Sequence, residues 1–233
     1  MFQRTQRVFL MAISLSSLRV GMASCVGLLA VLFTSVSAWA GPCDVLSDLE
    51  KSAALGKLAP EVTACLVGLR DAGEPTRSSQ ASSLLIANAF ASQDPESWAR
   101  HVKTHLESVD NSDCELMMKY GVHLLRADAP EEALTWIDAA AAHSFGWSAK
   151  VLEAKLFELR RLKTRALWAM YDQLGEDAGL KKRAALGKVQ LAAIEWMRAG
   201  AKGDRDISDA LSFCIKTGWT AERCEQQAAI QAR

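Results

Sequence analysis

The sequence predicts an all-α fold, a stack of antiparallel helical hairpins closed by a helical C-terminal cap. Helix-favouring Ala, Leu, Glu, Lys and Arg dominate the chain after Gly41, and no run of β-branched residues alternates with a strand's period of two. The dipeptide Pro-Glu begins at Pro60, Pro95 and Pro130, a constant spacing of 35 residues. A period of this size is typical of stacked helical repeats.

The composition limits the classes of function. The 233 residues include 27 Lys plus Arg and 27 Asp plus Glu, with 50% apolar and 7% aromatic residues, as in folded globular proteins. The formal net charge is zero and no long block carries one sign, so the basic surface that nucleic-acid binding requires is missing. We expect no nucleic-acid partner and one domain of moderate size.

Residues 1–40 differ from the rest of the chain. They contain three arginines and no acidic residue, then the apolar run VGMASCVGLLAVLFTSV, and they end in Ala38-Trp39-Ala40. This order predicts a signal peptide that is cleaved after Ala40. The alternative is an uncleaved anchor over Val20 to Ala40, which would make the chain a membrane-anchored structural subunit of an envelope complex. Gly, Ser and Thr interrupt the apolar run and favour cleavage, so membrane contact is expected only if this segment is retained.

Each Pro-Glu is expected to begin the second helix of a hairpin. Proline at the first helical position loses no hydrogen bond, and the glutamate beside it interacts favourably with the helix dipole. The first helices are expected in DVLSDLEKSAAL, QASSLLIANAFA and CELMMKYGVHLL. Such short hairpins cannot bury their apolar faces singly, so they should stack over residues 41–177. A fourth hairpin is expected from Ser148 onward, with Arg165 in the position of the proline.

The C-terminal region, residues 178–233, is expected to cap the stack. The segment GLKKRAALGKVQLAAIEWMRAGAKG predicts one long helix that ends at Gly200 or Gly203. Two shorter helices should follow, separated at Thr217-Gly218. Terminal helices that depart from the repeat cover the last exposed apolar face.

Cleavage after Ala40 would leave 193 residues, with 24 basic and 27 acidic side chains and a formal charge of −3. We expect the chain to reach the periplasm or to be secreted, an oxidising compartment where cysteines form disulfides. Cys214 and Cys224 lie five residues on either side of Trp219, so the last hairpin should bring them together. Cys43 and Cys65 bracket the first hairpin and are the second expected pair.

Cys114 is the odd cysteine and lies at the start of an expected helix. A helix N-terminus lowers a thiol pKa, so a catalytic thiol is conceivable. No histidine in its sequence context would partner it, which favours a buried free thiol.

Segment 114–147 resembles a tetratricopeptide repeat, a family of mostly protein-binding scaffolds. Met117 replaces the tryptophan of the first helix, and no unit carries the terminal proline. The resemblance implies a protein or peptide partner. It is carried by Tyr120-Gly121 in the first helix and by Ala133, Ile137 and Ala140 in the second, with Ala87, Phe90 and Ala99 at corresponding places one unit earlier.

The sequence carries few signs of chemistry. It has no phosphate-binding glycine loop, no nucleophile elbow, no haem-attachment motif and no paired CxxC, so we expect no cofactor and no catalytic activity. His101 and His105 are four residues apart on one helical face and could share a metal ion. No third ligand is identifiable, which favours two solvated histidines. A metal-binding or enzymatic protein using this pair remains the alternative. His123 and His143 are expected to be ordinary surface or interface residues.

A basic cluster supplies the candidate partner-binding residues. A concave basic patch in a stacked array suits an acidic peptide, whereas a solvated hairpin tip is the alternative. The tryptophans after Ala40 are expected to pack between helices. The sequence thus predicts an exported interaction module in which a partner segment docks in a groove between first helices. The cluster consists of Arg160, Arg161, Lys163 and Arg165.

Overall fold

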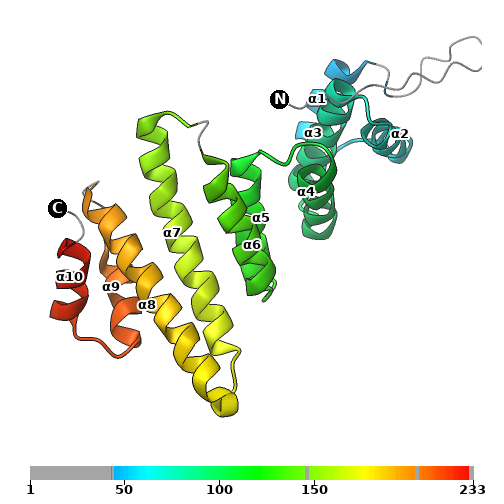
Figure 1. The fold of residues 1–233 in the computed structure, drawn as a ribbon. Coiled ribbons are helices and arrows are strands. Elements are labelled where there is room, and N and C mark those ends of the chain that lie inside the picture. Colours follow the sequence, from blue (N-terminus) through cyan, green and yellow to red (C-terminus); the bar gives the residue numbers. More distant parts are fainter. Residues whose placement is uncertain (1–42, 44, 145–146, 203–204, 231–233) are drawn as a thin grey trace, which may run out of the picture. The chain divides into compact units, whose positions relative to one another are not determined.

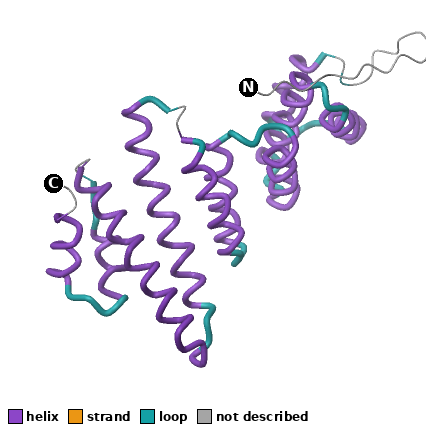
Figure 2. The backbone as a smooth tube through the Cα atoms, in the orientation of Figure 1, coloured by secondary structure: helices purple, strands orange, loops and turns teal. Residues whose placement is uncertain are grey.

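The computed structural model describes residues 43, 45–144, 147–202 and 205–230, and these form ten α-helices and no strand (Figure 1, Figure 2). The predicted all-α class is therefore confirmed. The expected signal peptide, residues 1–40, lies outside the described residues. Among the helices described, none combines the length and apolarity needed to cross a membrane.

Six helices occupy the region of the three expected hairpins. Each second helix begins at the proline of its Pro-Glu dipeptide, as predicted. The third helix begins earlier than expected because Glu74 caps it and Pro75 occupies its first position; the Glu74 carboxylate accepts a hydrogen bond from Arg77 N at 3.0 Å. The helices are α1 (Leu46–Ala54), α2 (Pro60–Asp71), α3 (Pro75–Ala91), α4 (Pro95–Ser108), α5 (Cys114–Arg126) and α6 (Pro130–Ala142). Helix α3 packs against α4 and α5 packs against α6, as expected, whereas α1 and α2 each pack chiefly against α3 rather than against each other.

The first helices of the three hairpins end in the same turn. In each, a backbone N–H donates to the carbonyl five residues earlier, and the residue before that N–H has a positive φ, which is the Schellman pattern. Gly56, Gln93 and Asp128 have φ values of 65°, 56° and 58°. The second and third turns are 35 residues apart, as are their Pro-Glu dipeptides. The bonds join Lys57 N to Ser52 O, Asp94 N to Ala89 O and Ala129 N to Leu124 O, at 2.9, 3.1 and 2.9 Å.

The fourth unit differs from the prediction. The residues expected to form two helices around Arg165 form one continuous helix, α7 (Ala149–Asp172). No Pro or Gly interrupts this segment, so nothing ends the helix at the expected turn. A short 3₁₀ turn, η2 (Glu176–Ala178), instead joins α7 to an equally long helix, α8 (Gly179–Lys202), which packs against it.

Two shorter helices follow α8, as predicted. They are α9 (Ser208–Lys216) and α10 (Ala221–Ile230), separated by Gly218 with a φ of 92°. Both pack against α8 and against each other. Trp196 and Met197 of α8 are buried against them.

Both expected cysteine pairs lie at disulfide distance. Cys43 pairs with Cys65, and Cys214 pairs with Cys224, with the Cα atoms 6.2 Å apart in each pair. Cys114 is buried and unpaired among the described cysteines. Burial raises the pKa of its thiol above the ordinary value, which disfavours a reactive thiolate.

The buried residues form a series of clusters, each shared by helices that are close in sequence. One joins α1, α2 and α3 around Leu66 and Leu85. The largest joins α4 to α7 around Met117 and Ile137. The last joins α8, α9 and α10 around Trp196. Local helix pairs thus account for most of the core.

Candidate functional site

A groove of about 1090 Å³ is lined by residues of α3, α4 and α5. Helices α3 and α5 are the first helices of the second and third hairpins, and α4 packs against both. The lining is mostly apolar. Its large apolar side chains are Ile86, Phe90, Trp98, Leu116 and Val122.

Phe90 is the most distinctive residue of this groove. Its side chain is 74% exposed, whereas Leu85 and Ala89 on the same helix are buried. Full burial of a phenylalanine side chain is worth about 1.5–3 kcal/mol. An occupant that covered Phe90 would gain much of that free energy.

Helix α5 contributes a basic edge to the groove. Lys119, His123 and Arg126 all line it and are spaced so that they share one face of the helix. The Nζ atom of Lys119 lies 3.9 Å from Oε1 of Glu115. Arg126 has no ion-pair partner among the described residues. The His123 ring lies 5.5 Å from the ring of Trp98, centre to centre.

The two acidic residues of the lining serve as helix caps. Asp94 accepts a hydrogen bond from Ser97 N at 3.0 Å at the start of α4, and Asp113 accepts one from Leu116 N at 2.9 Å at the start of α5. The bonds from Ser97 hold the pKa of Asp94 below its ordinary value. The lining therefore carries acidic side chains, Asp94 and Asp113, as well as the cations Lys119 and Arg126.

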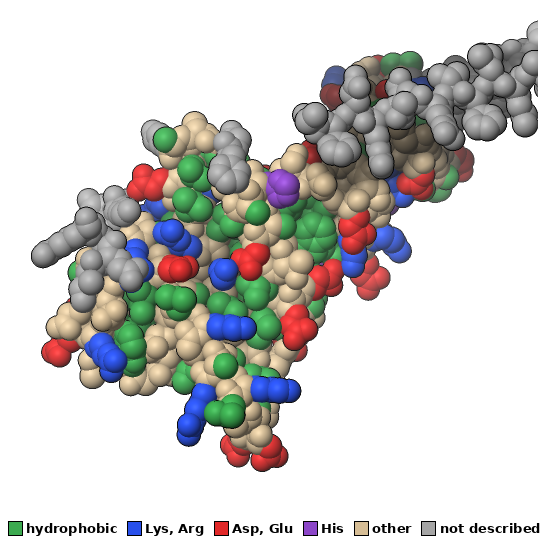
Figure 3. Space-filling model, viewed as in Figure 1, with side chains coloured by type: hydrophobic (Ala, Val, Ile, Leu, Met, Phe, Trp, Pro, Cys, Tyr) green, Lys and Arg blue, Asp and Glu red, His purple; other side chains and the backbone are tan. Residues whose placement is uncertain are grey.

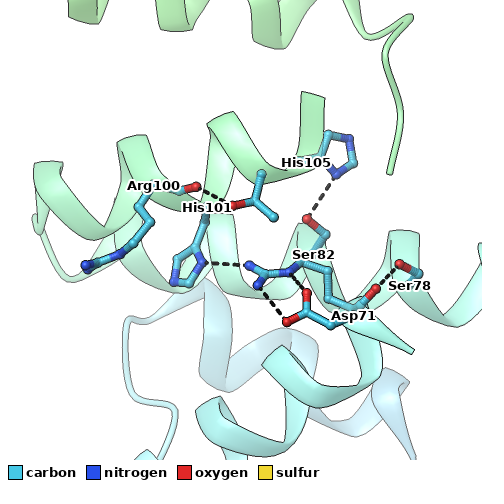
Figure 4. Close-up of polar contacts among 8 residues, drawn as sticks. Asp71, Ser78, Ser82, Arg100, His101 and His105 are labelled. Atoms are coloured by element: carbon cyan, nitrogen blue, oxygen red, sulfur yellow. Dashed lines mark hydrogen bonds and ion pairs between the residues drawn. The ribbon is translucent and has the colours of Figure 1, made fainter. Parts of the chain in front are cut away.

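The Nδ1 atoms of His101 and His105 contact side chains of two different helices. Arg70 Nη1 lies 3.4 Å from His101 Nδ1, and Ser82 Oγ lies 3.0 Å from His105 Nδ1 (Figure 4). The guanidinium can only donate, so His101 Nδ1 accepts and carries no proton. In the part of the chain that the structure describes, no group of three or more His, Cys, Asp or Glu side chains is arranged to hold a metal ion.

The expectation that these histidines are solvated is wrong. His105 is only 4% exposed, and His101 is half-buried against α2. Burial lowers the pKa of both imidazoles below the ordinary value of 6.5, and the charge of Arg70 lowers that of His101 further. Both rings are therefore stabilised in the neutral form. They join α4 to α2 and α3.

The predicted basic cluster lies in the middle of α7, so the expectation of a hairpin tip is wrong. Its residues are directed toward different neighbours. On the face drawn in Figure 3, basic and acidic side chains are interspersed rather than gathered by sign. The structure thus gives no support for a concave basic patch at Arg160. Arg161 pairs with Glu158, Lys163 Nζ lies 2.8 Å from Asp138 of α6, and Arg165 Nη2 lies 3.9 Å from Asp209 of α9.

Packing accounts for most of the tryptophans. Trp196 is buried. The ring of Trp136 packs edge-on against that of Tyr120, with 5.7 Å between the ring centres. The rings of Trp168 and Phe213 also pack edge-on, with their centres 5.8 Å apart. Of the described tryptophans, Trp98 is the one that lines the groove.

Comparisons with protein-family models, with curated proteins and with solved structures find no match to this chain. The candidate site therefore rests on its own geometry.

Most of the residues that form the groove are not site candidates from sequence. In the sequence Phe90 has significance only as a repeat position, and Lys119 and Arg126 belong to no recognisable motif. The available signal is the spacing of Lys119, His123 and Arg126, which places them on one face of α5. The buried Met117 and Leu124 lie on the opposite face.

Proposed function

We propose that this chain is an exported protein-interaction module that acts in the periplasm and binds a segment of a partner protein without catalysing a reaction. The observation that carries the proposal is the apolar groove between α3 and α5, with Phe90 exposed in it. Binding is non-covalent: apolar side chains of the partner cover Phe90 and Trp98 and displace water from them.

The close contact of α5 with α6 supports the resemblance to tetratricopeptide repeats. Ala133, Ile137 and Ala140 are buried there. A Cβ on Gly121 would lie 3.0 Å from Ile137 Cγ1, tighter than an ordinary contact. The small residues Gly121, Ala133 and Ala140 let the two helices approach closely, and this pairing holds α5 as one wall of the groove.

Two further observations support export. The N-terminal segment has the basic, apolar and small-residue order of a signal peptide. The two cysteine pairs at disulfide distance suit an oxidising compartment.

Site-specific photo-crosslinking in the exported full chain tests the proposal. A photoreactive phenylalanine analogue replaces Phe90 in one variant and Leu191 in the control. Leu191 is also exposed but lies on α8, away from the groove. We expect a discrete protein adduct from position 90 that is absent from position 191. Identical adducts at both positions, or none at position 90, would contradict the proposal.

A further inference from the structure

We infer that the disulfide between Cys43 and Cys65 is a redox-sensitive latch on α1, which an external dithiol opens while the disulfide between Cys214 and Cys224 stays intact. Reduction frees α1 from α2 and loosens its packing on α3. The inference concerns the regulation of the fold and does not depend on the proposed partner. It rests on the burial of the four cysteines and on the packing of α1.

The two disulfides differ in their access to solvent. Cys214 and Cys224 are both 0% exposed, in the buried cluster of α8, α9 and α10. Cys43 is buried too, but its partner Cys65 is only half-buried on α2. Thiol–disulfide exchange begins when a thiolate reaches a sulfur atom, so access decides which disulfide is attacked in the folded chain. An external thiolate thus has a route to Cys65, whereas it reaches Cys214 or Cys224 only after α9 and α10 open.

Helix α1 depends on this cross-link more than α2 does. Because α1 and α2 each pack chiefly against α3, the disulfide ties together two helices that have little direct packing. Helix α1 has 9 residues, too few to be stable as an isolated helix, and no side chain caps its N-terminus. Cys43 lies just before that N-terminus, so its release frees the uncapped end of α1.

Helix α1 packs on apolar side chains of α3. Leu46 and Ala53 of α1 are buried in one cluster with Leu84 and Leu85 of α3. Loosening of α1 would expose part of this cluster to water. Helix α3 also lines the groove, with Phe90 exposed there. The latch therefore acts on a helix that forms one wall of the groove.

The exchange is a two-electron reduction by the dithiol. One thiolate of the dithiol attacks Sγ of Cys65, the bond between the two chain cysteines breaks, and Cys43 leaves as a thiolate that takes up a proton. The second thiolate of the reductant then attacks the reductant sulfur bound to Cys65, which closes the reductant's own disulfide and releases Cys65 as a thiol. Cys114 is buried on α5, and burial raises the pKa of its thiol, so it does not compete as an internal nucleophile.

Timed alkylation tests the order of reduction. The purified full-length mature chain is treated with dithiothreitol, quenched at intervals with iodoacetamide and mapped by peptide mass. We expect Cys43 and Cys65 to be labelled about tenfold faster than Cys214 and Cys224, because the buried pair must first open. Urea below the unfolding transition raises the population of open forms, so it should accelerate the labelling of Cys214 and Cys224 alone.

Hydrogen exchange tests the release of α1. After selective reduction, amides of α1 and, to a smaller extent, α2 should exchange faster, while α5 and α6 keep their protection. Cys43→Ser with Cys65→Ser should show the same fast exchange without reductant and no further change with it. Cys214→Ser with Cys224→Ser is the matched control, in which α1 should stay protected until the dithiol is added.

Several results would overturn the inference. These are free thiols at Cys43 and Cys65 before any reductant is added, labelling of Cys214 and Cys224 at the same rate or earlier, and urea acceleration that is equal for the two pairs. Reduction of Cys43 and Cys65 that leaves hydrogen exchange in α1 unchanged would also overturn it, because the disulfide would then hold nothing in place.

Discussion

Gly56 lies in the turn that ends α1, and two independent constraints require glycine there. Its φ is 65°, a conformation that costs residues with a Cβ about 1–2 kcal/mol. A Cβ would also lie 2.6 Å from Ser92 N and 2.9 Å from the carbonyl carbon of Ala91, at the end of α3. The turn after α1 thus packs directly against the backbone at the end of α3, which leaves no space for a Cβ at position 56.

Replacing Gly56 by Ala should therefore destabilise the protein by about 2–4 kcal/mol, from backbone strain and overpacking together. Gln93 has a similar φ but an exposed position, so Gln93→Gly is the matched control. Glycine relieves the strain there while adding freedom to the unfolded chain, and a small gain of about 0.5 kcal/mol is expected. Urea denaturation measures both variants. An unchanged urea midpoint for Gly56→Ala would mean that neither the positive φ nor the contact with α3 requires glycine at this position.

At the scale of the element, α4 is held by two imidazoles that face different helices. His101 faces Arg70 of α2, with Arg100 and Asp94 nearby, and His105 faces Ser82 of α3, with Asp110 and Asp113 nearby. Both pKa values are lowered on folding, chiefly by burial. As the pH falls through 6.5, these two imidazoles therefore bind more protons in the unfolded chain than in the folded chain.

Stability from these imidazoles should be fully present above pH 6.5 and should fall as the pH drops below it toward their lowered pKa values. Equilibrium unfolding between pH 7.5 and 5 measures this loss. The double variant His101→Gln, His105→Gln should flatten the profile in that range, whereas His143→Gln, at an exposed position, should leave it unchanged. If the parent profile is already flat, neither imidazole is held neutral by folding.

The C-terminal pair α9 and α10 depends on a local cross-link. The disulfide between Cys214 and Cys224 closes a loop of 10 residues, and on the chain-entropy account it contributes about 2–3 kcal/mol. Helices α9 and α10 pack chiefly on α8. Loss of the disulfide should therefore destabilise α9 and α10 before more distant helices.

Replacing Cys214 and Cys224 by Ser should increase amide hydrogen exchange in α9 and α10 before α5 and α6. Replacing Cys43 and Cys65 by Ser provides the comparison and should act on α1 and α2 instead. Simultaneous loss of protection along the whole chain would contradict local stabilisation and indicate one cooperative core.

At the scale of the whole molecule, local signals predict the helices better than they predict the site. Pro60, Pro95 and Pro130 place helix starts correctly because proline is accepted at the first position and rejected inside. The repeat alignment fails at Arg165 because no Pro or Gly in this segment ends the helix, and α7 therefore continues through the expected turn. The exposure of Phe90 and the burial of His105 depend on which neighbouring helices cover α3 and α4, and no local pattern specifies that.

Maturation is a prediction for the whole chain. Intact mass of exported protein should correspond to a chain that begins at Gly41, less the four hydrogens removed by two disulfides. A mass that retains residues 20–40 would contradict cleavage after Ala40 and favour the membrane-anchored alternative.

The two disulfides also determine how the chain would respond to a pulling force. They close loops of 22 and 10 residues near opposite ends of the described sequence, and no cross-link is present between Cys65 and Cys214 in the residues described. Force applied at the termini would unravel the helices between them, while the residues inside the loops stay out of the extension. At about 3.4 Å per residue, the stretched chain is about 100 Å shorter than its reduced form. Its reach under tension would therefore depend on the redox state of its surroundings.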